Sequence, residues 1–154
     1  MRAVMGGDTV AVPVPGSAVR RAGTLWVPER ICQALRRRRL VAAVEPMVKR
    51  AITVDKSAYA PKGRRVTAQR HYETMAATRI DEPPDRVLLV DDVVTTGATM
   101  LAAASRVADL YPDATILGFA VVRAESDGDF DSLRDPVRGW IRKNRLNTLT
   151  TRRP

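Results

Sequence analysis

Two adjacent carboxylates and a run of hydroxyl side chains stand close together in the middle of the chain. Asp91 and Asp92 are followed by Val93 and Val94, and then by the run Thr95, Thr96, Gly97, Ala98 and Thr99. Carboxylate oxygens suit the vicinal hydroxyls of a sugar, and a loop of small residues offers backbone N–H groups and hydroxyls to an anion. Gly97 lets the backbone approach that anion closely. The combination predicts a sugar-phosphate site, with ribose 5-phosphate as the expected ligand.

A buried strand and a helix are expected to position these residues. The apolar run at 87–90 predicts a parallel strand that ends at the two carboxylates. Ligands of open α/β sheets bind beyond the carboxyl ends of the strands, so Asp91 and Asp92 would lie at the binding edge. Apolar residues at helical spacing from 100 to 110 predict a helix that begins at about Gly97 and directs its positive end at the phosphate. The alternative is a Rossmann-like strand and turn that binds no ligand or another phosphate.

The rest of the chain alternates predicted strands and helices. They are a strand at 9–14, a helix at 28–39, a strand at 40–47, a helix at about 67–79 and a strand at 114–122. Residues 53–70 lack periodicity, and such a long loop is usually functional or disordered. Residues 123–154 form a polar, basic tail with one amphipathic patch near 133–141. The order predicts an α/β fold with a doubly wound, mostly parallel sheet in a single domain, whose core spans about 10–123.

Composition limits the class of protein. A chain of 154 residues with 45% hydrophobic residues can bury the core of one domain. The sequence has neither a long apolar stretch nor a signal-like leader, so we expect a cytoplasmic protein that does not enter a membrane. The single cysteine, Cys32, lies on a predicted helix and is expected to be a buried structural thiol.

The segment at 86–99 resembles the phosphoribosyl pyrophosphate motif of the type I phosphoribosyltransferases. That motif has an apolar strand, two acidic residues, variable residues and then Thr-Gly-x-Thr, and in this segment the Thr-Gly-x-Thr lies at 96–99. The resemblance implies that Asp91 and Asp92 hold the ribose hydroxyls and that residues 94–99 hold the 5-phosphate. It also implies a small hood built from the chain termini and transfer of ribose 5-phosphate to an acceptor that the sequence does not identify. Mg²⁺ is the implied cofactor, with Asp91 and Asp92 as its nearest protein anions, mostly through substrate and water.

The same resemblance gives roles to residues outside the motif. The turn formed by Pro15, Gly16 and Ser17 would contact the pyrophosphate, together with Lys49 and Arg50. A basic residue of the loop at 53–70 would close over the site, and Lys56 and Arg64 are the catalytic candidates in it. The structural alternatives are an ordinary turn at 15–17 and solvated charge in the loop. The lone histidine, His71, is expected to be a polar residue on a helix surface or at a helix start, not a base.

Within this superfamily, the runs at 12–15 and 88–92 are most similar to ComF-like proteins, although the Arg-Gly-Phe-Asn-Gln segment of that group is missing. The net charge of +9 raises a second hypothesis. Arginines at 36–39 and basic residues at 142–153 lie beyond the predicted site, where they could end a helix, belong to a tail or contact phosphate backbones. The alternative function is an inactive phosphoribosyl pyrophosphate sensor or a nucleic-acid-associated protein. A small hood also leaves open a homodimer in which a second copy completes the site.

Overall fold

The computed structural model describes residues 8–54, 66–124, 138–143 and 150–153, and these ranges contain the following helices and strands. In chain order they are β1 (Thr9–Pro13), α1 (Val27–Arg37), β2 (Ala43–Val44), β3 (Val48–Arg50), α2 (Ala68–Glu73), β4 (Met75–Ala77), β5 (Arg86–Val94), α3 (Ala98–Leu110), β6 (Thr115–Arg123), β7 (Trp140–Lys143) and β8 (Thr150–Arg153). None of the helices in these ranges is long and apolar enough to cross a membrane.

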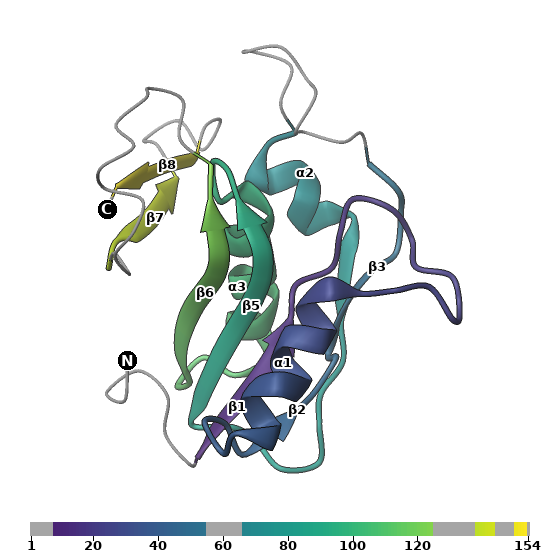
Figure 1. Cartoon of the computed structure of the whole chain (residues 1–154). Helices are drawn as coiled ribbons and strands as arrows, with labels where there is room; N and C mark the ends of the chain where they lie inside the picture. Colours follow the sequence, from purple (N-terminus) through teal and green to yellow (C-terminus); the bar gives the residue numbers. More distant parts are fainter. Residues whose placement is uncertain (1–7, 55–65, 125–137, 144–149, 154) are drawn as a thin grey trace.

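A four-stranded parallel sheet forms the centre of the fold. Its strand order is β2-β1-β5-β6, so that β1 and β5 lie side by side although they are far apart in sequence. Helix α1 covers one face of this sheet and α3 covers the other (Figure 1). Two antiparallel pairs, β3-β4 and β7-β8, lie outside the main sheet. The predicted α/β fold with a mostly parallel sheet is confirmed.

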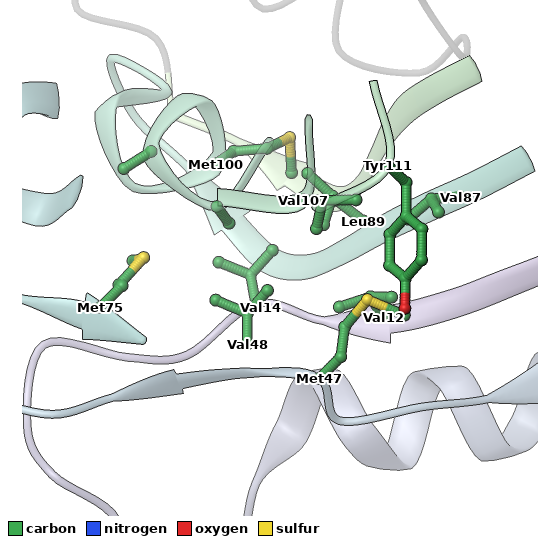
Figure 2. Close-up of a cluster of buried hydrophobic side chains, with 12 residues drawn as sticks. Val12, Val14, Met47, Val48, Met75, Val87, Leu89, Met100, Val107 and Tyr111 are labelled. Carbon is green, nitrogen blue, oxygen red and sulfur yellow. The ribbon is translucent and has the colours of Figure 1, made fainter. Parts of the chain in front are cut away.

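Side-chain alternation along the central strands divides the core into two clusters. Val87 and Leu89 of β5 face α3, where they pack with the buried residues that Figure 2 draws, among them Val12, Met100 and Val107. Leu88 and Val90 point to the opposite face, which α1 covers. There they pack with Ala11, Val41 and the α1 residue Cys32. Because successive side chains of a strand point to opposite faces, a sheet buried on both sides needs the continuous apolar run seen in the sequence.

Cys32 is the structural thiol that the sequence predicts. Its side chain is fully buried against the sheet, and burial raises the pKa of the thiol to about 12. A thiol held in the neutral form by apolar surroundings is a poor nucleophile.

Three predicted element boundaries are wrong. Of the strand expected at 40–47, only the two-residue strand β2 is formed, and the next strand, β3, begins after Pro46 at Val48 and belongs to a different sheet. The helix expected at 67–79 ends at Glu73, and the next residues form β4, which pairs with β3. At the end of α2 the Thr74 hydroxyl donates to the carbonyl of Arg70. The strand expected to stop at 90 continues as β5 to Val94, because β6 pairs with it along this extension.

Helix α1 ends in a left-handed residue that is not glycine. Arg39 has φ 56°, and its N–H donates to the carbonyl of Arg36, while the N–H of Leu40 donates to that of Leu35. These two bonds form a Schellman motif, in which glycine is the usual left-handed residue. The exposed arginines at 36–39 therefore surround a helix C-terminus, where positive charge is favourable.

We expect Arg39→Gly to stabilise the protein, because glycine adopts positive φ without the contact between Cβ and the backbone. The gain in the free energy of unfolding should be up to about 1 kcal/mol, measured by urea unfolding. Arg38→Gly is the matched control, since Arg38 has an ordinary φ of −86°. That variant should be no more stable than the parent chain, and equal stabilisation by both glycines would contradict the argument.

Candidate functional site

A pocket lies where β5 passes into α3, at the carboxyl end of the sheet. Its walls come from the end of the strand, the loop at 95–97, the first turn of α3 and one side chain of α2. The lining residues are His71, Asp91, Val93, Val94, Thr95, Thr96, Gly97, Ala98, Thr99 and Met100. The structure therefore brings together one carboxylate and the whole hydroxyl-rich run that the sequence predicts as a sugar-phosphate site.

The two aspartates differ in their relation to this pocket. Asp91 lines it, whereas Asp92 is not among the lining residues. The reason is the extension of β5, since residues of a strand alternate between faces and Asp91 follows Val87 and Leu89 on the α3 side. Each carboxylate also accepts a hydrogen bond from the backbone that follows it. The N–H of Asp92 donates to Asp91 Oδ1 at 2.9 Å, and the N–H of Val93 donates to Asp92 Oδ1 at 2.9 Å.

The environment of Asp91 favours its neutral form. Burial, followed by a side-chain hydrogen bond and the like charge of the neighbouring Asp92, raises the pKa of the Asp91 carboxyl from 3.8 to about 7, against the opposing effect of the backbone hydrogen bond. A carboxylate held out of water next to a second one is a costly arrangement in the free protein. Such an arrangement is common where a ligand later supplies hydroxyl donors or a cation.

The loop between β5 and α3 depends on a left-handed glycine. Gly97 is the N-cap of α3, with φ 80° and ψ 8°. A Cβ at this position would lie 2.5 Å from Ile141 Cδ1, because Ile141 of β7 packs directly over the glycine. The predicted helix start at about Gly97 is confirmed, and the helix presents its first N–H groups and positive end to the pocket. This is the usual arrangement for binding phosphate at a helix N-terminus.

A buried arginine ties the turn after β1 to this region. Arg50 is 5% exposed. Its Nε donates to the carbonyl of Gly16 at 2.8 Å, and Nη1 donates to Thr74 Oγ1 at 2.7 Å. The Ser17 carbonyl accepts from the N–H of Val54 at 2.8 Å. Most hydrogen-bond donors of Arg50 are therefore paired with other groups of the protein. The bond to Gly16 fixes the turn at 15–17 near the carboxyl end of β1.

His71 is a site residue that the sequence does not reveal. The expectation of a helix-surface position is wrong, because its side chain is only 2% exposed and lines the pocket. Its ring lies between Arg50 and Thr99, with Nδ1 3.1 Å from Arg50 Nη2 and Nε2 3.3 Å from Thr99 Oγ1. The sequence signal that could have indicated its burial is its spacing from Ala68 and Met75. Both are buried, and the three residues lie on the inward side of a short amphipathic segment.

The other predicted residues that the structure describes are not among those that line the pocket. Lys49 is exposed on β3, Gly16 is exposed in its turn, and Pro15 is buried beside it. Lys56 and Arg64, the two catalytic candidates of the long loop, lie outside the described residues.

The described residues include no group of three or more His, Cys, Asp or Glu side chains that could hold a metal ion. Asp91 and Asp92 nevertheless offer the oxygen ligands that Mg²⁺ prefers. Mg²⁺ commonly keeps several waters and binds through one or two carboxylates together with substrate phosphates, and this pair fits that role.

Comparison with known families gives one match. The family model of the phosphoribosyl transferase domain matches residues 32–144, which is well over half of the chain and includes the whole pocket lining. No curated protein matches the sequence.

Proposed function

The chain belongs to the phosphoribosyl transferase domain family, and on that premise we propose that it binds phosphoribosyl pyrophosphate and transfers ribose 5-phosphate to an acceptor. Pyrophosphate would leave from the anomeric carbon. The observation that carries the proposal is the pocket that joins the Asp91 carboxylate to the loop at 95–97 and the start of α3. A sugar phosphate needs both features in one pocket, one for its hydroxyls and one for its phosphate.

The 5-phosphate is assigned to the backbone N–H groups and hydroxyls of residues 94–99. Asp91 and Asp92 would accept hydrogen bonds from the ribose 2- and 3-hydroxyls and so orient the anomeric carbon. Departure of pyrophosphate builds positive charge on the ribose ring, and the carboxylates stabilise that charge electrostatically. When bound, Mg²⁺ would supply a positive charge that neutralises the pyrophosphate, with Asp91 and Asp92 as its nearest protein anions, mostly through substrate and water.

The leaving group is assigned to the turn formed by Pro15, Gly16 and Ser17, together with Lys49. Arg50 would act chiefly by holding this turn, because its donors already serve Gly16, Thr74 and His71. Lys56 and Arg64 remain the proposed basic residues that cover the substrate. Positioning and charge stabilisation are the main demands of this reaction, and the assigned residues supply both.

Three finer points belong to the same proposal. ComF-like proteins are the proposed nearest relatives, on the residues at 12–15 and 88–92. We place the protein in the cytoplasm as one domain, with a core at about 10–123 and a basic tail or hood after it. The acceptor is unidentified, and a second copy of the chain is the proposed partner for completing a small hood.

The direct test is calorimetric titration of phosphoribosyl pyrophosphate into the full chain, with and without Mg²⁺, at moderate salt. We expect a dissociation constant on the order of micromolar that depends on Mg²⁺. Nucleobases and other nucleophiles would then be screened for release of pyrophosphate. Absence of binding under both conditions would contradict the proposal, whereas tight binding without turnover of any acceptor would favour a sensor.

A further inference from the structure

A continuous chain of hydrogen bonds connects the turn after β1 to the first turn of α3. It runs from the Gly16 carbonyl through the Arg50 guanidinium to the His71 ring, and from there to the Thr99 hydroxyl. The two middle members are buried, with Arg50 5% and His71 2% exposed. The two ends belong to the loops that the proposed function assigns to pyrophosphate and to the 5-phosphate.

The chemistry of the partners fixes the direction of these hydrogen bonds. A guanidinium has only donors, so Arg50 Nη2 donates and His71 Nδ1 must accept. A neutral imidazole that accepts at Nδ1 carries its proton at Nε2. Nε2 therefore donates to Thr99 Oγ1. Because the hydroxyl accepts this bond, its own hydrogen is left to be donated elsewhere.

The pocket is the place where the Thr99 hydroxyl can donate its hydrogen to a ligand. Thr99 lines the pocket with Thr95, Thr96 and Gly97. Within the described ranges, His71 is its only side-chain hydrogen-bond partner. An ordinary threonine hydroxyl rotates to suit its neighbours and can turn its lone pairs toward a ligand. In this pocket the bond from His71 occupies one of the two lone pairs and leaves the hydroxyl hydrogen free, so the hydroxyl can meet a ligand as a donor.

The neutral state of the ring is supported by its surroundings. Burial and, to a lesser extent, the positive charge of Arg50 together lower the pKa of His71 to about 4. The ring therefore keeps one accepting and one donating nitrogen at neutral pH, as the bonds to Arg50 and Thr99 require.

We propose that His71 is a positioning residue of the phosphate site: it holds the Thr99 hydroxyl as a hydrogen-bond donor aimed at the phosphate of the bound sugar. This rests on the proposed function, which places a phosphate in the pocket. The arrangement favours a ligand group that only accepts hydrogen bonds, as a phosphate dianion does. Through Arg50, the same ring is tied to the turn at 15–17, so the two phosphate-binding loops share one buried support.

The tautomer can be measured without changing the protein. The chain contains one histidine, so its imidazole nitrogen NMR spectrum reports His71 alone. At pH 7 we expect the neutral ring protonated at Nε2, both in the free protein and with ribose 5-phosphate bound. A ring protonated at Nδ1, or an imidazolium, would overturn the proposal, because neither could accept from Arg50 and donate to Thr99 in the way described.

A double-mutant cycle tests whether His71 acts through Thr99. The variants are Thr99→Val, His71→Phe and the pair, and the probe is ribose 5-phosphate titrated by calorimetry. Each single change should weaken binding by about tenfold, since a hydrogen bond to a charged group is lost. The pair should be little weaker than either single variant. Full additivity would mean that His71 only supports the fold and would overturn the proposal.

Two controls keep the outcomes separate. Ser105→Ala removes a hydroxyl that donates within α3, to the Leu101 carbonyl, and should leave the affinity unchanged. Thr99→Val should leave binding of Mg²⁺-pyrophosphate unchanged, because that ligand belongs to the other loop. If His71→Phe does not fold, Thr99→Val and the NMR tautomer decide between the outcomes. Failure of the parent chain to bind ribose 5-phosphate would count against the proposed function itself, whereas binding unaffected by Thr99→Val would overturn only this inference.

Discussion

Asp91→Asn should weaken binding of phosphoribosyl pyrophosphate roughly a hundredfold while making the free protein more stable at neutral pH and above. The loss of affinity follows because Asp91 is the carboxylate that lines the pocket. An amide keeps the shape of the side chain but loses its charge and one acceptor. Asp92→Asn, outside the lining, should have a smaller effect on affinity, and a double Asn variant should lose measurable binding.

The gain in stability follows from the raised pKa of Asp91, which is about 7 in the folded protein against 3.8 ordinarily. The unfolded chain ionises first as pH rises, so folding stability from this group is fully present below about pH 4 and is lost progressively up to about pH 7. Asparagine has no proton to lose. The stability difference between variant and parent should therefore be near zero at pH 4 and reach its plateau, up to a few kcal/mol, above pH 7.

Thermal unfolding at pH 4 and pH 8 measures this difference. For a domain of this size each kcal/mol corresponds to roughly 2–4 °C in the unfolding midpoint, so the variant should gain several degrees at pH 8. Asp113→Asn is the control, because Asp113 is exposed near the opposite end of the sheet. A variant that is less stable than the parent at pH 8 would show that the Asp91 carboxylate supports the fold, contrary to its assignment as a ligand-binding group.

Gly97→Ala is expected to damage both the fold and the site. The positive φ of Gly97 is unfavourable for any residue with a Cβ, by roughly 1–2 kcal/mol. The new methyl group would also collide with Ile141, whose side-chain atoms lie 2.5–2.9 Å from the position that an added Cβ would take. Relief of either problem requires the loop at 95–97 or β7 to move. We expect a loss of at least about 2 kcal/mol in the free energy of unfolding and of at least tenfold in affinity for ribose 5-phosphate.

Two further variants separate the causes. Gly16→Ala should be tolerated by the fold, because Gly16 has no positive φ and no atom lies within 4 Å of an added Cβ. Combining Gly97→Ala with Ile141→Ala removes the collision and leaves the backbone strain, so it should recover part of the affinity. Full recovery of affinity in this double variant would mean that positive φ at 97 matters little. Unchanged affinity in Gly97→Ala alone would contradict the assignment of the loop at 95–97 to ligand binding.

The sequence could predict the part of the site whose residues are contiguous in the chain. A strand, a carboxylate, a glycine and a helix start follow one another between 86 and 99, and each has its own short-range signal. His71 and Arg50 lack such a signal, because their roles depend on three-dimensional neighbours. The bond from His71 to Thr99 and the bond from Arg50 to Gly16 each join residues that lie far apart in sequence. The amphipathic spacing around His71 indicates that the ring faces inward, but it does not indicate that Arg50 and Thr99 are its partners.

The same distinction explains the incorrect boundaries. Helix α2 ends early at Glu73 because Met75, Ala76 and Ala77 pair with β3, although their helix propensity alone would allow α2 to continue. Strand β5 runs past Val90 because β6 offers it partners up to Arg123. The hairpin β7-β8 follows from a pairing of Trp140 with Arg153, which the basic composition of the tail does not indicate. Pairing between segments overrides local preference in each case.

The strand order β2-β1-β5-β6 also affects when, during synthesis of the chain, the central sheet can form. Thr9 of β1 pairs with Arg86 of β5, so the central strand gains its second neighbour only when most of the chain has been synthesised. Until then, β1 has just the two-residue strand β2 beside it. Closing so long a loop is slow, and β5 is both the strand that joins β1 to β6 and the strand that carries Asp91. We therefore expect assembly of the core and assembly of the pocket to be coupled, because both require β5.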